Sequence, residues 1–451
     1  MIQNILFILV DGLRADQCYG NDKESHTPFL DSLIDSGVYF SNTFSPADGT
    51  ITSLNCMFNS KFQYETGIRA KKIILLENNH LQKLKELNYY TVGLIPKLTE
   101  LQPLANLLEN KECMYEPGPP PETLSTGMTD KISKLLTSLD NISKPWFCYI
   151  HLLDLHPLRE GRSPLKIEEF EQEKFGNSTY AKTVSSIDYW LMKISKKINF
   201  DNTLFVFTGD HGERIPFGGK IDFQFEPELK QVSSIGKKLL PKASHKIGGK
   251  MMAKIKKSVG KSRVDHSNKD LTPYQKRSRD PYFTLSLHDE LLHIPLLIKG
   301  KHLPSKNISQ QVSNLDIFPT IFDIFGISYK KSKYRNSLFP LINNRKIPSW
   351  NIFLHTMPYQ KESSLDRMGI RTSKFKYFRN SRNSKKDVHL YDLENDPYEN
   401  NNIFEHNSEI IEKMEKKLYD MQKDSKKIDE KLIKEQEDHE MSQELKKMGY
   451  M

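Results

Sequence analysis

The chain of 451 residues is 37% hydrophobic and 10% aromatic, which suffices for a substantial core and excludes wholesale disorder. Its formal net charge of +9 is concentrated between Lys220 and Asp280, where 16 Lys or Arg residues stand against 6 Asp or Glu residues. A general nucleic-acid binder usually carries its charge on the folded body, so we expect no nucleic-acid partner. The length predicts one large α/β domain with an appendage, or two domains.

The N-terminal sequence MIQNILFILVDG holds an apolar run that ends before Asp11. The run is too short for a secretory signal or a membrane span, and it predicts a buried first strand. The four cysteines are widely spaced and form no CxxC pair, which favours reduced thiols. We therefore expect a cytoplasmic protein, with peripheral contact to a membrane as an open alternative.

Apolar runs that alternate with helical patterns predict a sheet with helices on both faces. One predicted helix covers 27–37, where Thr27 can cap the helix and Pro28 suits its first position. A longer one covers 178–198, where apolar residues recur every three to four positions. The predicted strands lie at 4–10, 89–95, 146–153, 203–209 and 294–300.

After residue 350 the pattern changes to the short runs NIFLHT, KFKYFRN and DVHLYDL, which predict a small antiparallel sheet. From about residue 407 a charged helical pattern predicts a solvated surface or a frayed tail. The predicted parts are a main α/β domain at 1–218 and 284–345, an insertion at 219–283, a C-terminal β subdomain at 346–405 and a charged helical tail at 406–451.

The insertion at 219–283 interleaves Lys with Leu, Ile, Met and Val and contains several glycines. One interpretation is a solvated surface loop. The other is a cationic amphipathic element that lies on anionic lipid or holds an anionic polymer. The sequence leaves both interpretations open.

Two predicted strands end in residues suited to chemistry. The first ends in VDGLRAD, with Asp11 at its carboxyl edge, and the strand at 203–209 ends in FTGDHGE, with Asp210 and His211. Open α/β sheets bind ligands at this edge. Carboxylates with an imidazole suit Mn²⁺, Zn²⁺ or Fe²⁺ better than Ca²⁺, which prefers oxygen ligands alone. We therefore predict a divalent metal ion, with Mn or Zn favoured and Ca or Mg as further options.

The hydroxyl-rich helix start DGTITS and the residues after it offer several nucleophiles, namely Thr50, Thr52, Ser53, Cys56 and Ser60. A threonine hydroxyl does not ionise at neutral pH, but a bound cation can supply an alkoxide. The stretch by itself does not decide which group reacts.

Several blocks follow one another between residues 1 and 405: NILFILVDGLRADQCYG, TPFLDSLIDSGVYFSNTF, FTGDHGE, IPLLIKG with LDIFPTIFDIFGI, and LYDLENDPYENNNI. In this order they resemble the blocks of the sulfatase family in the alkaline phosphatase superfamily. The resemblance implies an alkaline phosphatase-like α/β fold. Its sheet is mixed, mostly parallel and flanked by helices, and a small antiparallel subdomain follows at the C-terminal side.

The resemblance also assigns a nucleophile. In formylglycine sulfatases a C/S-x-P-S-R motif opens this helix some sixteen residues before a closing Thr-Gly. Counting back from Thr66 and Gly67 places Thr50 at the nucleophile position, with neither the Pro nor the Arg of the motif in place. Formylglycine is made only from Cys or Ser. We therefore predict Thr50 as an unmodified nucleophile, with Ser53 as the fallback.

A second departure concerns the metal ligands. The family's usual Asp-Asp pair is Asp11-Gly12 here, and its usual Asp-Asn pair is Asp210-His211. This change resembles threonine-dependent relatives, which are phosphotransferases and phosphodiesterases with Mn²⁺ or Zn²⁺. We therefore assign the metal to Asp11, Thr50, Asp210 and His211.

Block positions also suggest residues that bind the substrate. His156 resembles the family's substrate histidine, and Lys97 lies near the position of the Gly-Lys-Trp-His block. His288 occupies a position where a substrate-facing residue is expected. His151 alternates with apolar residues in a buried strand, and we interpret it as structural.

The resemblance implies a metal-dependent hydrolase or transferase that cleaves a phosphate ester or diester through Thr50. The first alternative is a sulfuric-ester hydrolase, that is, a sulfatase. The second is an inactive family member that binds an anionic glycan or lipid. The expected partner is an anionic ester substrate, for which a glycan or a lipid carrier is an option.

Overall fold

The computed structural model describes residues 3–68, 72–118, 122–160, 168–215, 271–279, 286–329, 337–357 and 365–423. The chain divides into two compact units, one made of Met1–Glu213 with Thr284–Met451 and the other of Arg214–Phe283. Apart from 271–279, which includes helix α10 (Pro273–Arg279), the predicted insertion at 219–283 lies outside the described residues. The predicted tail beyond residue 423 lies outside them as well.

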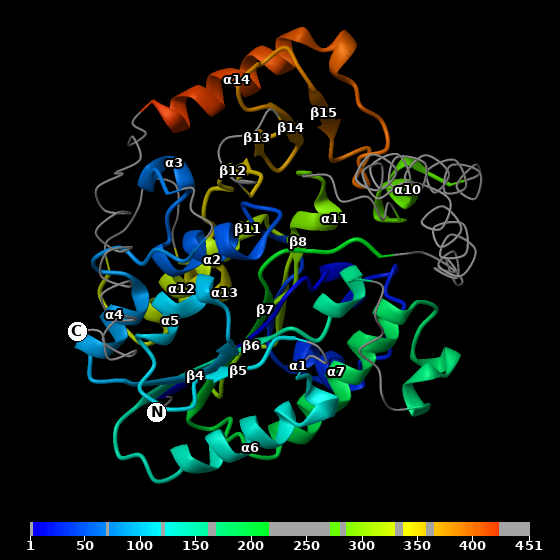
Figure 1. Ribbon diagram of the computed structural model, residues 1–451. Coiled ribbons are helices and arrows are strands. Elements are labelled where there is room, and N and C mark those ends of the chain that lie inside the picture. The colour runs from blue at the N-terminus through cyan, green and yellow to red at the C-terminus, as the bar shows by residue number, and fades with distance from the viewer. Residues whose placement is uncertain are drawn as a thin grey trace, which may run out of the picture. The chain divides into compact units, whose positions relative to one another are not determined.

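An eight-stranded sheet forms the centre of the larger unit (Figure 1). Its strands pair in parallel except at β9, which runs antiparallel to both of its neighbours, β2 and β7. This mixed, mostly parallel sheet confirms the predicted fold class. In spatial order the strands are β10 (Lys306–Ile308), β2 (Val38–Phe40), β9 (Leu296–Lys299), β7 (Thr203–Gly209), β1 (Asn4–Val10), β6 (Trp146–Leu152), β4 (Tyr90–Pro96) and β5 (Met114–Tyr115).

The four central strands β7, β1, β6 and β4 lie within one residue of their predicted bounds, because each is a continuous apolar run buried on both faces. The predicted strand at 294–300 instead divides at Pro295. Its first part is β8 (His293–Ile294), which joins a small sheet with β3 (Thr43–Phe44) and β11 (Val312–Ser313). Its second part is β9, since a proline has no N–H to continue the ladder.

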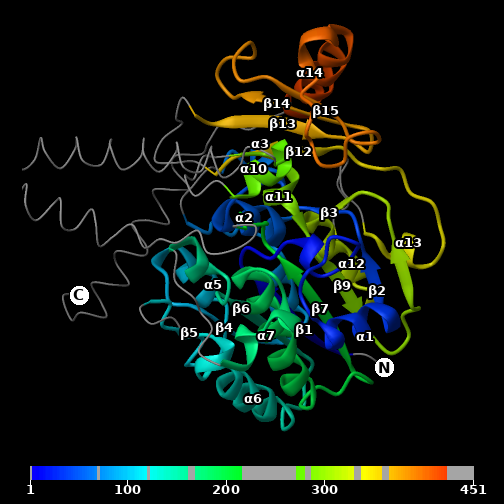
Figure 2. The ribbon, with the colours of Figure 1, turned by 90° about the vertical axis from the view of Figure 1, so that its right-hand side faces the viewer.

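Helices cover both faces of the large sheet (Figures 1 and 2). One face carries α1 (Pro28–Ser36), α6 (Met128–Leu139) and α7 (Thr179–Ser195). The other carries α2 (Thr50–Asn59), α4 (His80–Glu86) and α12 (Ile317–Ile324). Short helices complete the unit: α3 (Gln63–Thr66), α5 (Gln102–Ala105), α11 (Asp289–Leu292) and α13 (Phe339–Ile342).

The start of α1 depends on a tertiary contact. Pro28 occupies the first helical position as predicted, but the Thr27 side chain makes no capping hydrogen bond. The carboxylate of Asp188 in α7 instead accepts from the backbone N–H groups of Phe29 at 3.1 Å and Leu30 at 2.7 Å. A neighbouring helix therefore satisfies the amide groups that a local cap would otherwise bind.

Aromatic rings fill the core between the sheet and the helices α2 and α12. The Phe318 ring of α12 stacks on Phe7 of β1 at 5.7 Å between centroids and on His80 of α4 at 4.9 Å. It also lies 5.5 Å from Phe58 of α2 and 6.1 Å from Phe147 of β6. One side chain thus joins two strands to three helices.

The C-terminal part forms a four-stranded antiparallel sheet covered by α14 (Ser408–Gln422). Three of the strands match the predicted short runs, whereas β13 was not predicted. Met414, Leu418 and Met421 of α14 are buried in the core of this sheet, while most other residues of the helix are exposed, so the predicted charged helix packs one apolar face on the sheet. The strands are β12 (Ile352–His355), β13 (Arg367–Arg371), β14 (Phe375–Asn380) and β15 (His389–Asp392).

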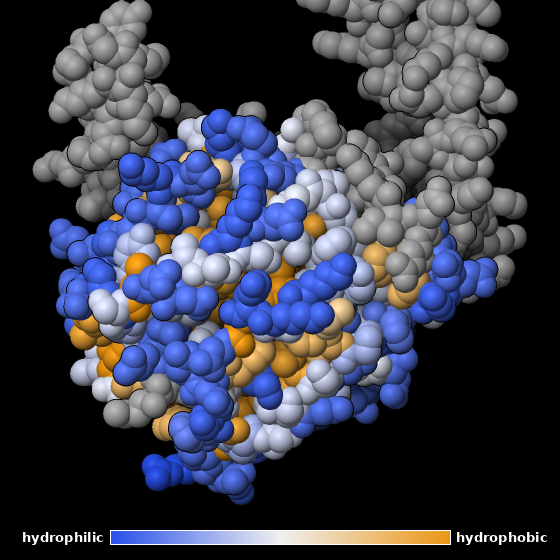
Figure 3. All heavy atoms as spheres, turned by 90° about the horizontal axis from the view of Figure 1, so that it is seen from below, coloured by the Kyte–Doolittle hydropathy of each residue, from blue (hydrophilic) through white to orange (hydrophobic). Residues whose placement is uncertain are grey.

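Figure 3 shows one face of the protein, on which hydrophilic side chains predominate and apolar side chains gather near the middle. Within the described ranges, no helix combines the length and the apolar character that crossing a membrane requires. The cytoplasmic location and the peripheral membrane contact stay predictions.

We expect Phe318→Ala to lower the free energy of unfolding by about 3–5 kcal/mol, because it removes a ring that contacts two strands and three helices. Chemical denaturation followed by circular dichroism measures this change. Leu87→Ala is the control, since Leu87 is 39% exposed and its loss should cost less than about 0.5 kcal/mol. Equal effects of the two substitutions would contradict the central position of Phe318.

Candidate active site and metal centre

The candidate site lies where β1 and β7 end. Asp11 directly follows β1, and Asp210 directly follows β7. The backbone N–H of Asp11 donates to the carbonyl of Leu152 in β6 at 2.9 Å, which continues the pairing of the strands to this edge. Because parallel strands end at the same edge of a sheet, the three strands bring side chains distant in sequence together.

Thr50 is the first residue of α2, and its hydroxyl faces this edge. Its Oγ1 donates to Asp11 Oδ2 at 2.8 Å and lies 3.2 Å from His211 Nε2. The preceding Gly49 is extended, so the chain enters the helix directly at the hydroxyl-bearing residue. Asp11 is 2% exposed and His211 1% exposed, so both proton acceptors of this hydroxyl are buried.

The imidazole of His211 has a defined tautomer. Its Nδ1 lies 2.6 Å from the carbonyl oxygen of Gly212, which can only accept a hydrogen bond. Nδ1 therefore carries the proton, and in the neutral ring Nε2 presents its lone pair. Nε2 faces Thr50 and also lies 3.5 Å from Asp210 Oδ2.

The carboxylate of Asp210 is fully buried and has two different oxygens. Oδ1 accepts from the backbone N–H groups of Gly12 at 3.0 Å and His211 at 2.9 Å. Oδ2 has no hydrogen-bond partner. One oxygen thus fixes the side chain, and the other remains available to a ligand.

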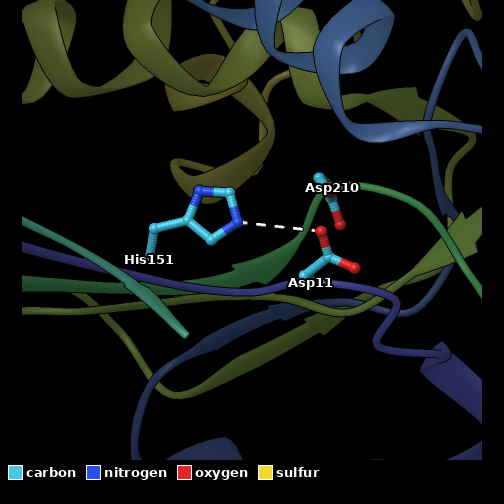
Figure 4. Close-up of side chains that lie close together, drawn as sticks. All are labelled: Asp11, His151 and Asp210. Carbon is cyan, nitrogen blue, oxygen red and sulfur yellow. Dashed lines mark ion pairs between the residues drawn. The ribbon is translucent and has the colours of Figure 1, made fainter. Parts of the chain in front are cut away.

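His151 of β6 also belongs to this site (Figure 4). One ligand atom each of Asp11, His151 and Asp210 lies within 4.8 Å of the others, and all three residues are buried. This geometry makes His151 a further candidate ligand, whereas the sequence pattern favours a structural role for it. Its alternation with apolar residues reflects the burial of β6, but the parallel register places His151 beside Leu9, two residues before Asp11. The sequence pattern of β6 does not reveal that His151 lies near Asp11, because this proximity depends on how β6 pairs with β1.

The buried group fits a divalent cation. Asp11 and Asp210 bring two carboxylates to within a few ångströms of each other, and such like charges repel unless a cation or a proton lies between them. Within the part of the chain that the structure describes, neither Asp210 Oδ2 nor His151 Nε2 has a hydrogen-bond partner. Oxygen and nitrogen donors of this kind are ligands of first-row divalent metals.

Ser53, the fallback nucleophile, is committed to other contacts. Its hydroxyl is fully buried and donates to the carbonyl oxygen of Asp210 at 2.6 Å. It accepts from Asn314 Nδ2 at 2.8 Å and lies 3.1 Å from Ser45 Oγ. These bonds make Ser53 a link between α2 and the end of β7 and favour a structural role for its hydroxyl.

Three residues were predicted to bind the substrate, namely Lys97, His156 and His288, and each has different neighbours in the structure. Lys97, directly after β4, is 62% exposed in its side chain and pairs with Glu116 at 2.6 Å. The buried His288 contacts Ser286 Oγ through Nδ1 at 2.6 Å and Tyr391 OH through Nε2 at 3.1 Å. These contacts are within the protein and favour structural roles for both residues. His156 is partly exposed and opens the 3₁₀ turn His156–Glu160 after β6.

Asp48, which the sequence analysis did not single out, supports the start of α2. Its carboxylate accepts from the backbone N–H groups of Ser286 at 3.0 Å and Met357 at 2.8 Å. Burial raises the pKa of this carboxyl. Asp48 lies two residues before Thr50. The segments around Ser286 and Met357, more than 200 residues later in the chain, are thus bonded close to the start of α2.

Comparison with protein families assigns the chain to one family. The family model described as Sulfatase matches residues 3–327, which is more than half of the chain. The chain belongs to the sulfatase family. A second model, described as N-sulphoglucosamine sulphohydrolase, C-terminal, matches residues 282–424 and covers the antiparallel sheet with α14.

Relatives of this sulfatase-family chain are distant. Arylsulfatase K of Mus musculus is 24% identical over 303 residues, which cover 64% of this chain and 52% of that protein. The chain thus spans about half the length of this relative. The ulvan-active sulfatase of Formosa agariphila is 24% identical over 453 residues, which cover 89% of this chain and 75% of that protein.

Solved structures share the fold at lower identity. A 2-O GAG sulfatase superposes with a TM-score of 0.62 at 17% identity, over 93% of this chain and 92% of that chain. The phosphonate monoester hydrolase of Agrobacterium radiobacter superposes with a TM-score of 0.60 at 15% identity, over 93% and 95%. The fold is therefore that of the sulfatases and of enzymes that act on phosphonate esters.

A second buried carboxyl follows β6. Asp154 Oδ1 accepts from the backbone N–H of Leu124 at 2.9 Å, while Oδ2 has no hydrogen-bond partner. Burial disfavours the charged form and raises the pKa of Asp154 to about 7. The folded state therefore keeps a proton that the unfolded chain, with its ordinary pKa of 3.8, releases. The contribution of Asp154 to the free energy of unfolding is therefore most favourable below pH 4, and it decreases as the pH rises towards 7.

We expect Asp154→Asn to remove this dependence, because the amide oxygen can still accept from Leu124 and the side chain carries no charge. The variant should unfold like the parent near pH 4 and be more stable by about 1–3 kcal/mol at pH 8. Denaturation midpoints across this range measure the difference. Asp140→Asn, at an exposed position, is the control. A difference that does not grow with pH would contradict the assignment.

Proposed function

We propose that the protein hydrolyses an anionic ester with Thr50 as nucleophile and with a divalent cation at Asp11 and Asp210. The observation that carries this proposal is the position of the Thr50 hydroxyl, 2.8 Å from Asp11 Oδ2 and 3.2 Å from His211 Nε2. A nucleophile and a base within hydrogen-bond distance are the arrangement that nucleophilic catalysis requires. In this proposal Thr50 is the nucleophile and His211 is its base, so of the ligand set predicted from the sequence the two carboxylates hold the cation.

His211 accepts the proton of Thr50 as the hydroxyl attacks. The bond from Nδ1 to the carbonyl of Gly212 keeps the lone pair on Nε2 and aims it at Thr50 Oγ1. In the structure the single hydroxyl proton is directed to Asp11 Oδ2, and rotation about the Cβ–Oγ1 bond of Thr50 brings it to His211 Nε2. The backbone N–H of His211 binds Asp210, which positions the base relative to the carboxylate.

A divalent cation, when bound, favours the deprotonated form of a hydroxyl and offsets the charge of the ester oxygens. The chain adds a further favourable field, because the N-terminal end of α2 carries partial positive charge next to Thr50. Water is restricted, since Asp11, Asp210, His151 and His211 are all at most 2% exposed. Low solvent access strengthens each of these interactions.

The relatives support a sulfuric ester on a glycan as the first candidate substrate. Their names describe an arylsulfatase, an ulvan-active sulfatase and a GAG sulfatase. We propose that this chain likewise acts on an anionic glycan ester. Transfer to an acceptor hydroxyl and an inactive, ligand-binding role stay predictions. Neither has support in these names.

A phosphate or phosphonate ester is the second candidate. Thr50 cannot be converted to formylglycine, so a covalent intermediate on its oxygen must be released by attack of water on the same central atom. Phosphorus esters react in this way at metal-assisted sites. The shared fold with a phosphonate monoester hydrolase supports this candidate.

Turnover of matched 4-nitrophenyl esters should decide between the candidates. We expect metal-stripped protein to be inactive on the sulfate, the phosphate and the phenylphosphonate ester, and at least one activity to appear after addition of Mn²⁺ or Zn²⁺. Sulfate cleavage would support the first candidate, and phosphonate or phosphate cleavage the second. Turnover of no ester with any of Mn²⁺, Zn²⁺, Ca²⁺ or Mg²⁺ would contradict the proposed function.

A pair of variants should identify the nucleophile. Thr50→Ala should lower kcat by at least about 10³-fold, because it removes the attacking oxygen. Ser53→Ala should lower kcat by about tenfold and reduce stability by about 1–3 kcal/mol, because it leaves the buried partners of the hydroxyl without a hydrogen bond. Steady-state kinetics and denaturation measure both. The opposite ranking of the two kcat values would make Ser53 the nucleophile.

A further inference from the structure

His151 lies in β6 with Nε2 directed towards the carboxylates of the site (Figure 4). Its parallel partner in β1 is Leu9, so His151 shares a face with Leu9 and with Asp11 two residues further on. Nε2 lies 3.8 Å from Asp11 Oδ2, which is too long for a hydrogen bond. Ligand atoms around a four-coordinate zinc ion lie about 3.4 Å apart, so the present spacing is close to that of a metal centre.

Among the described residues, Nε2 of His151 has no hydrogen-bond partner, and the side chain is fully buried. An unpaired buried polar atom is unfavourable unless a ligand binds it. The neighbouring Asp210 Oδ2 is unpaired and fully buried as well. Two unpaired donor atoms, from strands on either side of β1, therefore face the same small volume as Asp11.

Tyr149 determines how the imidazole is turned. Its hydroxyl lies 3.2 Å from His151 Nδ1, two residues along the same strand and on the same face. The phenol oxygen of Tyr149 can accept a hydrogen bond from Nδ1. When Nδ1 donates to Tyr149, Nε2 presents its lone pair to the carboxylates. The backbone of His151 is held too, since its carbonyl accepts from Tyr115 OH at 2.7 Å.

The Tyr149 ring is itself fixed by two aromatic contacts. It meets Phe58 of α2 edge to face, with centroids 5.4 Å apart and planes at 85°, and it meets Phe7 of β1 at 5.7 Å and 60°. Phe58 belongs to the helix that begins with Thr50. The ring that turns the histidine is thus packed against the helix that carries the nucleophile.

We propose that His151 ligates the metal through Nε2 and that Tyr149 is the residue that positions it. The centre then selects a borderline metal such as Zn²⁺ or Fe²⁺ over Ca²⁺. This inference rests on the metal dependence of the proposed function. It adds a ligand that the pattern of strand ends does not contain.

The choice of metal follows from the donor atoms. Ca²⁺ takes six to eight oxygen ligands, whereas an imidazole suits Zn²⁺ and Fe²⁺. Replacing His151 by a carboxylate would turn the set Asp11, His151 and Asp210 into oxygen donors alone. The ratio of the Zn²⁺ and Ca²⁺ affinities therefore reports whether His151 is a ligand.

The test is a calorimetric titration of the full, metal-stripped chain with Zn²⁺ and with Ca²⁺, in the absence of any ester. His151→Asp should reduce the preference for Zn²⁺ over Ca²⁺ by at least about tenfold. Tyr149→Phe keeps the ring and its aromatic contacts, and should weaken Zn²⁺ binding by about 10-fold to 100-fold, as is typical when the partner of a metal-ligating histidine is lost. Tyr39→Phe is the matched control, because Tyr39 is a buried tyrosine of the distant strand β2.

Pulsed electron paramagnetic resonance of the Mn²⁺-loaded protein gives an independent readout. Direct imidazole ligation couples the nitrogen of the ring to the manganese spin, and His151→Asp should remove one such nitrogen. An unchanged nitrogen signal would assign it to His211 and overturn the inference. So would Zn²⁺ and Ca²⁺ affinities that stay equal to the parent's in both His151→Asp and Tyr149→Phe.

The two variants separate the parts of the inference. One outcome is that His151→Asp loses the preference for Zn²⁺ while Tyr149→Phe binds Zn²⁺ as the parent does. This result would support His151 as a ligand and overturn the positioning role of Tyr149. If His151→Asp does not fold, as judged by circular dichroism, the Tyr149→Phe titration and the parent's nitrogen signal decide. Since no substrate is present, metal binding through His151 without ester turnover would overturn the proposed function and leave this inference standing. A parent that binds neither ion would overturn the inference.

Discussion

The parallel pairing of β1 with both β6 and β7 is the constraint on which the site depends. It brings Asp11, His151 and Asp210 to one sheet edge although about 200 residues separate the first from the last. The three strands are apolar and buried, so their register is determined by packing over their whole length. A shift of one residue would turn His151 to the opposite face and remove it from the carboxylates.

The nucleophile is positioned from the other side by α2. Ser53, one helical turn beyond Thr50, bonds to the carbonyl oxygen of Asp210, and Phe58 packs on Tyr149. The helix is therefore attached both to the end of β7 and to the residue beside His151. Such bonds to rigid elements hold a hydroxyl within hydrogen-bond distance of its base, which loop contacts alone do less well.

The C-terminal sheet is joined to this arrangement by buried polar groups. Asp48 accepts from Ser286 and Met357, and the Ser286 hydroxyl contacts His288, which in turn contacts Tyr391 of β15. A separate cluster holds the buried Lys376 of β14 between Asp289 and Glu399. Because unpaired buried charges are costly, these contacts keep the C-terminal sheet in one position relative to α11 and the start of α2.

The sequence by itself determined the central strands, the sulfatase family and the convergence of Asp11, Thr50, Asp210 and His211, because apolar runs and strand-end motifs are local signals. Only the tertiary structure showed the surroundings of His151, Ser53 and Lys97, since each depends on neighbours from other elements. A buried histidine in an apolar strand has the same sequence pattern whether it packs or binds a metal. The register of β6 against β1 distinguishes the two, because it alone sets which groups face Nε2.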